Sequence, residues 1–349
     1  SMDMLQTIAK LCSLPGVTGD ERAVGEWIRQ CFLKYTQEVW QDRYGNVYGR
    51  IGEKVGPEIL VMAHMDEIGL MVTGIEENGM LRMMPVGGVD PRVLPGSEVL
   101  VLGEKPLPGV IGAIPPHLTK GKTGAAYRIE DLICDVGYPV EQVRAWVHEG
   151  DYITFAPKPP LSLKNGYVSS KTLDDRSLVA VMMECMERLQ RRKLQCSVVF
   201  CASVQEERSG LGGALGAYSV HPDMAIAIDV CHGPTPGVKP FETTPMDKVL
   251  LTRGSNIHEK LFAMLEDAAK EQNIETDVEA VMGHTGTDAW LMQIQRGGIP
   301  CGLVSPPLRY MHTSVETIRM ETLHNCAKVL SGMIGSIDEK WEEALCLDD

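Results

Sequence analysis

The chain has few aromatic side chains, which make up only 5% of its 349 residues. This scarcity disfavours proteins that bind sugars by stacking them on aromatic rings. Positive side chains are also fewer than negative ones, 33 against 47, and the net charge of −14 disfavours nucleic acid and anionic membranes as partners. No apolar run approaches the roughly 18–20 residues of a membrane span, so no membrane partner is expected.

Disulfide-forming patterns are also lacking. The ten cysteines include no Cys-x-x-Cys pair, and most of them lie in apolar runs. The amino terminus has neither the basic segment nor the apolar segment of a secretory signal. We therefore expect reduced, buried thiols in a cytoplasmic protein.

Two kinds of sequence pattern divide the chain. Towards both ends, apolar runs alternate with segments of helical periodicity, which is typical of a mostly parallel sheet covered by helices. Residues 69–161 have short runs with dense glycine and proline, which is typical of a small all-β domain, with one helix expected at 140–148. We therefore expect an α/β domain formed by residues 1–68 and 162–349, interrupted by a β-rich insert.

The individual elements of the α/β domain follow from periodicity and from turn residues. Strands are expected at 38–43, 47–51, 59–63, 197–204, 224–228, 248–252, 277–281 and 300–304. Helices are expected as a pair within 4–38, separated at Pro15-Gly16, and at 177–191, 211–219, 257–272, 287–296 and 317–337.

Acidic side chains and histidines follow the apolar runs. In open α/β sheets, ligands bind beyond the carboxyl ends of the strands, so these residues are expected to lie near one another. Imidazole nitrogens and carboxylate oxygens together suit Zn²⁺, Co²⁺ or Mn²⁺. Taken singly, each residue has an ordinary alternative: a hydrogen-bonded structural histidine, acids at a helix start, or a solvated loop. The residues in question are His64, Asp66, Asp174, Glu206, Glu207, Asp229 and His312.

Other catalytic motifs are missing from the sequence. His148 and His258 are each followed by Glu, but neither has the second His of an HExxH zinc motif. A GxSxG nucleophile elbow and a P-loop are also absent, and the glycines at 210–213 miss the GxGxxG spacing. These absences leave the strand-end residues as the candidate site.

Six segments of the chain surround or accompany these residues. They are Ala63-His64-Met65-Asp66-Glu67-Ile68-Gly69, Lys171-Thr172-Leu173-Asp174-Asp175-Arg176, Val204-Gln205-Glu206-Glu207, Ile228-Asp229-Val230, Gly286-Thr287-Asp288-Ala289 and Arg309-Tyr310-Met311-His312. Together they resemble the signature blocks of the tetrahedral aminopeptidase family of dinuclear metallopeptidases, which includes glutamyl aminopeptidases. The blocks occur in the family's order and cover most of the chain.

The resemblance implies two divalent metal ions in each subunit, Zn²⁺ or Co²⁺, with Mn²⁺ as a further candidate. By position in the blocks, His64 and Asp229 bind one ion, Glu207 and His312 bind the other, and Asp174 bridges the two. Metal coordination lowers the pKa of water towards ~7, so the implied reaction is attack of a metal-bound hydroxide on the scissile carbonyl.

Two further residues have implied roles, and one departure from the family pattern stands out. Glu206 is the implied general base, and Asp66 is implied to orient the His64 imidazole. Here Glu207 is followed by Arg208-Ser209-Gly210, one residue longer than the family pattern. The extra residue puts the shape of the substrate pocket in question.

The resemblance also implies the substrate and the assembly. The implied substrates are peptides with a free amino terminus, from which the enzyme releases one residue at a time. The β insert is the implied site of self-association, with dimers that build up to a dodecamer. The preferred first residue does not follow from the sequence.

Three other functions remain open. A dinuclear deacylase of N-acyl amino acids would use the same ligands. A glycoside hydrolase would use Glu206 with a second carboxylate, but it needs no histidine ligands. A metal-stabilised assembly without catalysis is least favoured, because the candidate base Glu206 is present.

Overall fold

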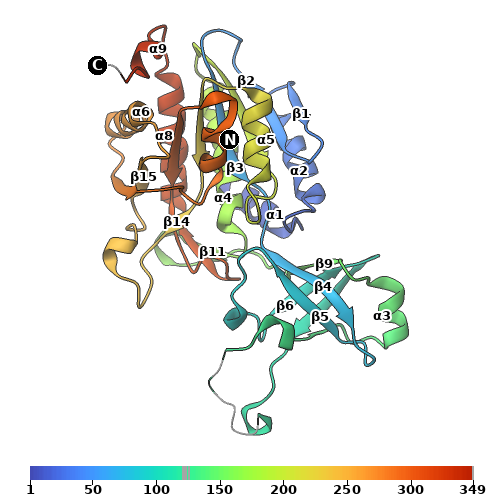
Figure 1. The fold of residues 1–349 in the computed structure, drawn as a ribbon. Helices are drawn as coiled ribbons and strands as arrows, with labels where there is room; N and C mark the ends of the chain where they lie inside the picture. Colours follow the sequence, from blue (N-terminus) through green and yellow to red (C-terminus); the bar gives the residue numbers. More distant parts are fainter. Residues whose placement is uncertain (120–123, 125, 348–349) are drawn as a thin grey trace.

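The structure is a computed structural model that describes residues 1–119, 124 and 126–347. A large mixed sheet forms its centre, and a small barrel projects from one end (Figure 1). The sheet has eight strands in the order β1-β2-β12-β3-β13-β17-β15-β16. Their bounds are β1 Val39–Gln41, β2 Val47–Ile51, β12 Ser197–Ser203, β3 Glu58–His64, β13 Met224–Ile228, β17 Cys301–Ser305, β15 Val249–Gly254 and β16 Thr276–Val281.

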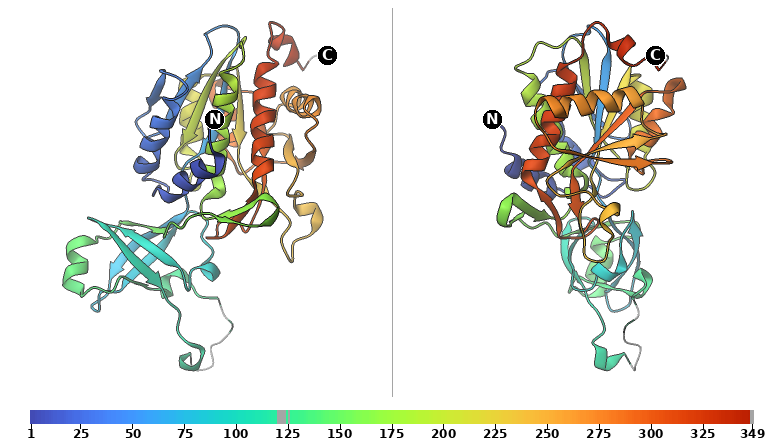
Figure 2. Two further views of the ribbon diagram at one scale, coloured as in Figure 1. Left: turned by 180° about the vertical axis from the view of Figure 1, so that it is seen from behind. Right: turned by 90° about the vertical axis from the view of Figure 1, so that its left-hand side faces the viewer.

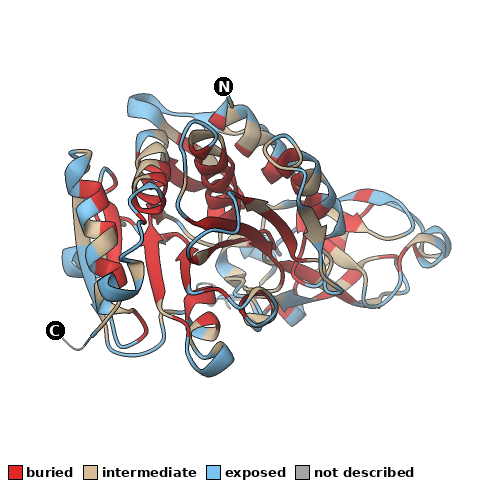
Figure 3. Cartoon of the chain, turned by 90° about the horizontal axis from the view of Figure 1, so that it is seen from above, coloured by how far each residue is buried: buried red, intermediate tan, exposed pale blue. Residues whose placement is uncertain are grey.

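The middle of the sheet is parallel and buried. Strands β12, β3, β13 and β17 pair in parallel with one another, and every residue of β12, β13 and β17 is buried. Continuous apolar runs suit strands that are covered on both faces, and the sheet is the buried centre in Figure 3. The expected α/β fold with a mostly parallel sheet is confirmed.

Helices cover both faces of the sheet (Figure 2). On one face α4 packs against α1, α8 and β3, while α6 packs against α8; on the other, α5 packs against α7 and β12. No helix of the described residues has the length and apolar character needed to cross a membrane. The helices are α1 Met4–Ser13, α2 Arg22–Phe32, α4 Leu173–Leu189, α5 Leu211–Val220, α6 Glu259–Glu271, α7 Asp288–Gln293, α8 Met320–Gly335 and α9 Trp341–Ala344.

The inserted segment folds into a closed barrel with its own hydrophobic core. Its first and last strands pair with each other, with Leu70 opposite Ile153, so the chain enters and leaves the barrel at one place. The single helix expected there is α3 (Val140–Trp146). The barrel strands are β4 Gly69–Ile75, β5 Leu81–Val86, β8 Cys134–Asp135, β7 Pro106–Ile111, β6 Glu98–Leu102 and β9 Tyr152–Phe155.

A second, five-stranded sheet between the two units was not expected from the sequence. Residues 317–319, expected to be helical, instead form part of β19, where Ile318 pairs with Val168, and α8 begins only at Met320. Strands of two to four residues are too short to show a periodicity, which explains the error. The strands are β10 Leu161–Ser162, β11 Tyr167–Ser170, β19 Glu316–Arg319, β18 Pro307–Arg309 and β14 Cys231–His232.

Two smaller expectations can also be compared with the structure. The helix expected at 287–296 ends at Gln293, and Arg296 just beyond it has a φ of +54°, a left-handed conformation that cannot continue an α-helix. All ten cysteines are free, as expected, and eight of them are buried.

A buried ionic network fastens the barrel to the α/β domain. The Glu67 carboxylate accepts hydrogen bonds from Lys171 (3.1 Å) and Arg176 (2.6 Å), and it also contacts the hydroxyl of Thr154 on β9. Burial raises the pKa of Glu67, but the attraction of the two cations outweighs burial and lowers it overall. The network therefore holds Asp174, which lies between Lys171 and Arg176 in sequence, in a fixed place relative to the barrel.

We predict that the α/β domain folds without the barrel. Deleting residues 71–152 and joining Leu70 to Ile153 by a short glycine linker should leave a chain that unfolds cooperatively, because the two units have separate cores. Circular dichroism during heating measures the cooperativity of unfolding, and residues 69–156 expressed alone provide the same measurement for the barrel. Loss of cooperative unfolding in the chain that lacks residues 71–152 would contradict the prediction.

Candidate metal centre

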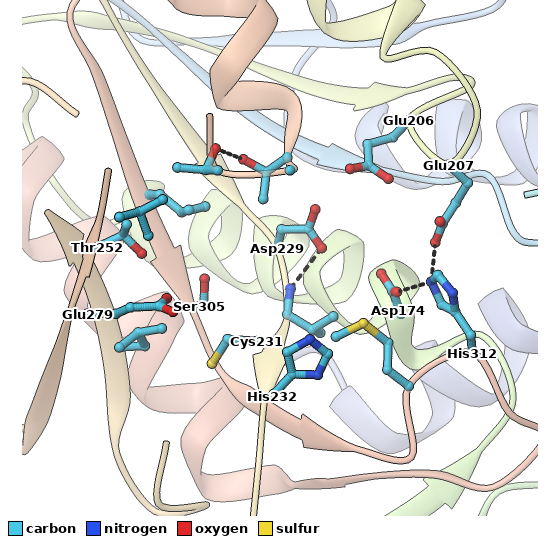
Figure 4. A pocket seen from close by; sticks show the side chains of 18 residues that line it. Asp174, Glu206, Glu207, Asp229, Cys231, His232, Thr252, Glu279, Ser305 and His312 are labelled. Atoms are coloured by element: carbon cyan, nitrogen blue, oxygen red, sulfur yellow. Dashed lines mark hydrogen bonds and ion pairs between the residues drawn. The ribbon is translucent and has the colours of Figure 1, made fainter. Parts of the chain in front are cut away.

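The candidate ligands lie at the carboxyl ends of neighbouring strands. His64 is the last residue of β3, and Asp229 follows β13 directly. Glu206 and Glu207 follow β12, which lies beside β3 in the sheet. Because these strands are parallel, their ends meet at one edge, and Figure 4 shows the acidic side chains turned towards one cavity.

Two ligands come from outside the large sheet. Asp174 lies at the start of α4, just after β11, and His312 lies in the turn between β18 and β19. The sequence placed His312 after the apolar run at 300–304, but the short strand β18 lies between them. The small sheet therefore brings both residues to the edge of the large one.

The Asp174 carboxylate lies between two imidazoles. Its Oδ1 is 3.1 Å from Nε2 of His64, and its Oδ2 is 3.1 Å from Nε2 of His312. One carboxylate with an oxygen towards each imidazole has the geometry of a bridge between two neighbouring cation positions.

The other carboxylates lie close to the same two imidazoles. Nε2 of His64 lies 3.4 Å from Glu206, 3.8 Å from Asp229 and 3.9 Å from Glu207. Nε2 of His312 lies 3.1 Å from Glu207 Oε1. Ligand atoms within 4.8 Å of one another form three overlapping groups among the described residues: His64, Asp174, Asp175 and Asp229; His64, Glu206 and Glu207; and Asp174, Glu207 and His312.

The backbone at the site takes uncommon conformations. Thr172, Gln205 and His312 have φ values of +65°, +56° and +64°, and the Asp174–Asp175 peptide bond is cis. Positive φ is uncommon for residues with a side chain, and such strain gathers at functional sites. Here it occurs at His312 itself and within two residues of Asp174 and Glu206.

Asp66 fixes two parts of the site at once. Its buried carboxylate lies 3.3 Å from Nδ1 of His64, and it accepts the backbone N–H groups of Glu206 (3.1 Å) and Glu207 (3.0 Å). The backbone carbonyl of Asp66 is also 3.1 Å from Nδ1 of His64. Asp66 thus contacts the imidazole that it was expected to orient and, in addition, holds the loop that carries both glutamates.

Two supporting groups were missed by the sequence analysis. The buried Glu316 carboxylate accepts the backbone N–H groups of Asp174 (3.0 Å) and His312 (2.7 Å). The backbone carbonyl of Gly88, in the inserted segment, lies 2.9 Å from Nδ1 of His312. A single Glu in a strand and a backbone carbonyl form no recognisable sequence motif. The contact of the insert with His312 is therefore seen only in the structure.

The site carries an excess of buried negative charge. Burial raises the pKa of Asp174, but hydrogen bonds with His312 and His64 outweigh it and lower the pKa overall. Burial lowers the pKa of His312, but hydrogen bonds with Asp174 and Glu207 raise it to about 11. Burial and repulsion between carboxylates raise the pKa values of Glu206 and Asp229 well above the usual range.

This donor set fits divalent metal ions. Buried carboxylates are stable only when a positive charge compensates them, and a divalent cation supplies more charge than an imidazolium. Mixed nitrogen and oxygen ligands are those of zinc, cobalt and manganese sites. His64, Asp174, Glu207, Asp229 and His312 therefore fit the ligand set expected for two ions.

The metal centre opens into a cavity of about 420 Å³. Its walls come from the ends of β13, β17, β15 and β16 and from residues 285–287. The residues after Glu207 do not line it: Ser209 and Gly210 donate backbone hydrogen bonds to the carbonyl of Gln205 and form a tight turn. The extra residue of this chain is therefore accommodated away from the cavity.

Comparison with protein families gives a match over residues 45–329 to the M42 glutamyl aminopeptidase family. The chain belongs to this family. It is therefore an aminopeptidase, a hydrolase that removes residues from the amino end of peptides, and the family resemblance seen in the sequence is confirmed.

Individual relatives agree with this assignment. The lysyl aminopeptidase of Pyrococcus furiosus is 32% identical over 336 residues, which cover 94% of this chain and 96% of that one. The structure of aminopeptidase APDkam598 from the archaeon Desulfurococcus kamchatkensis has a TM-score of 0.91 with 30% identity over 99% of both chains. The TET1 peptidase of Pyrococcus horikoshii, described as assembling into a tetrahedron or a large octahedral shell, has a TM-score of 0.85 with 30% identity over 96% of this chain and all of that one.

We predict that metal binding releases protons. With its pKa raised to about 11, His312 is protonated at pH 7 in the metal-free protein and has to lose that proton before it can bind a cation. Metal affinity should therefore rise with pH, by about tenfold per unit for each proton released. Titration calorimetry with Co²⁺ in buffers of different ionisation enthalpy counts the protons.

Two variants make this measurement specific. His312→Gln should release about one proton fewer than the parent protein. His324→Gln, which changes a histidine paired with Glu184 outside the site, should leave the count unchanged. Equal heats in all buffers would show that His312 is not protonated before the metal binds.

Proposed function

We propose that this protein is an aminopeptidase that depends on two divalent metal ions and uses Glu206 as its general base. The observation that carries the proposal is the Asp174 carboxylate, which lies 3.1 Å from an imidazole on each side. His64 and Asp229 would hold one ion, Glu207 and His312 the other, and Asp174 would bridge them. When bound, the two ions would lower the pKa of water at the site and polarise the scissile carbonyl.

Glu206 is suited to move the proton. Its carboxylate lies 3.4 Å from Nε2 of His64 and faces the cavity. In this role Glu206 accepts a proton from the attacking water and passes it to the leaving amine.

A free amino terminus suits the charge of the cavity. Carboxylates line the cavity, and none of its described lining residues is a lysine or an arginine. A peptide end that carries an amine is therefore favoured over an acylated end, which bears no charge. This distinguishes an aminopeptidase from the dinuclear deacylase that would use the same ligands.

Self-association through the inserted barrel is the second part of the proposal. The barrel unit carries large apolar side chains that are exposed, including Val110, Ile114 and Leu118 at 50–62% exposure. Large apolar side chains that are exposed in a monomer are candidates for contacts between subunits. We propose that dimers form through the barrel and build up to a dodecamer, which light scattering of the chain with residues 71–152 deleted would test.

We predict that the enzyme cleaves peptides with a free amino terminus and spares acetylated ones. Acetylation removes the charge of the α-amine and should lower kcat/KM by about 10- to 100-fold, the typical scale for losing a charged hydrogen bond. The measurement compares one tetrapeptide with and without an acetyl group, after metal has been added back. Equal rates would favour the deacylase, and release of the acetyl group itself would establish it.

We predict that Glu206→Gln abolishes turnover and spares metal binding. Glutamine keeps the shape of the side chain but cannot accept a proton, and loss of a general base typically costs ~10²–10⁴-fold in kcat. Steady-state kinetics and metal analysis of the same sample measure both effects. A variant that keeps the parent kcat would assign the base elsewhere, and one that also loses metal would make Glu206 a ligand.

A further inference from the structure

The far end of the cavity is built by one face of three neighbouring strands. Side chains alternate along a strand, so residues two apart share a face. Thr252 lies opposite Glu279 in the pair β15–β16, and Leu250 lies opposite Ser305 in the pair β15–β17. The six lining residues of this face are Leu250, Thr252, Glu279, Val281, Leu303 and Ser305.

Glu279 is an acid without a cationic partner. It is an exposed residue on the edge strand β16, and no lysine, arginine or histidine of the described residues forms an ion pair with it. Asp277, two residues earlier, lines an adjoining cavity of about 280 Å³ together with Glu279. Neither cavity is lined by a described lysine or arginine, so their shared wall has a negative potential.

Thr252 provides an independent sign that a ligand binds here. The residue is 2% exposed, and its hydroxyl oxygen is buried with no hydrogen-bond partner among the described residues. Figure 4 shows this hydroxyl on the side of the cavity where Glu279 and Ser305 also lie. Buried hydroxyl groups are normally hydrogen-bonded, so the Thr252 hydroxyl is an unused hydrogen-bonding group at the wall of the cavity.

The chemistry of this end matches a long cationic side chain. The carboxylate and the two hydroxyl groups can all accept hydrogen bonds, and an ammonium or guanidinium group has several N–H donors and no acceptor. Apolar side chains of Leu250, Leu303 and Val281 line the approach, as a hydrocarbon stem requires.

The width of the sheet also favours a long side chain. Asp229 follows β13, and β16 lies three strand positions away across β17 and β15. With neighbouring strands about 4.8 Å apart, roughly 14 Å separate the backbones of β13 and β16. A short side chain that begins at the metal centre would leave Glu279 and Thr252 without contact.

We propose that the cavity holds the first side chain of the peptide and that Glu279 selects lysine or arginine at this position. The inference rests on the proposed function, because it assumes that the scissile bond lies at the metal centre. The family description refers to glutamyl substrates and one relative is a lysyl aminopeptidase, so the comparisons leave the first residue open. Glu279 repels a glutamyl side chain and attracts a lysyl one.

The test compares first residues whose side chains carry a positive, a neutral or a negative end. Lysine, its Nε-acetyl derivative, norleucine, arginine and glutamate are presented as nitroanilides to the metal-loaded enzyme, and kcat/KM is measured for each. Norleucine keeps the stem of lysine without the ammonium group. We expect lysine and arginine to exceed norleucine by about 10- to 100-fold, the scale of a charge-assisted hydrogen bond, and glutamate to be the poorest substrate.

Three variants test which residue causes the preference for lysine over norleucine. Glu279→Gln should bring the lysine-to-norleucine ratio close to one. Thr252→Val should lower the same ratio by a smaller factor. Glu271→Gln, which removes an exposed acid on α6 outside the cavity, is the matched control and should leave the ratio unaltered.

Each result decides between the possibilities. Release of norleucine or glutamate at least as fast as lysine by the parent enzyme would overturn the assignment of Glu279 while leaving the aminopeptidase intact. A lysine preference that survives Glu279→Gln would overturn it as well. Release of none of the five first residues would overturn the proposed function and this inference together.

Discussion

Asp174 directs one carboxylate oxygen at His64 and the other at His312, 3.1 Å away in both cases. Both contacts are supported by groups that do not line the cavity. Glu316 holds the backbone of Asp174 and His312, and Asp66 holds the loop of the two glutamates. Buried charges are costly unless hydrogen bonds hold them in good geometry. The site therefore depends on the hydrogen bonds of Glu316 and Asp66 as well as on the ligands themselves.

The two structural units of the chain meet at this bridge. Parallel strands of the large sheet bring three ligand positions to one edge, the small sheet adds Asp174 and His312, and a backbone carbonyl of the inserted segment contacts His312. The cavity beside Asp174 extends along the neighbouring strands β17, β15 and β16 as far as Glu279. One sheet edge thus carries both the proposed chemistry and the proposed choice of substrate.

The sequence predicted the parts of this arrangement that depend on local patterns. Continuous apolar runs marked β3, β12 and β13, and the polar residues after them were the expected ligands. The small sheet was missed, because strands such as β11 and β19 are too short to show an alternating pattern in the sequence. They are stabilised by pairing with each other. Glu316 and the carbonyl of Gly88 were missed for the same reason, since their roles depend on contacts between segments far apart in sequence. The selectivity of the cavity also required the strand register, which alone places Glu279 beside Thr252.

Anomalous diffraction from crystals of the metal-loaded protein, recorded at the absorption edge of the bound metal, tests the central claim most directly. The account predicts two ions in each subunit, one beside His64 and Asp229 and one beside Glu207 and His312, with an oxygen of Asp174 bound to each. A single ion, or two ions that leave Asp174 unbound, would contradict it.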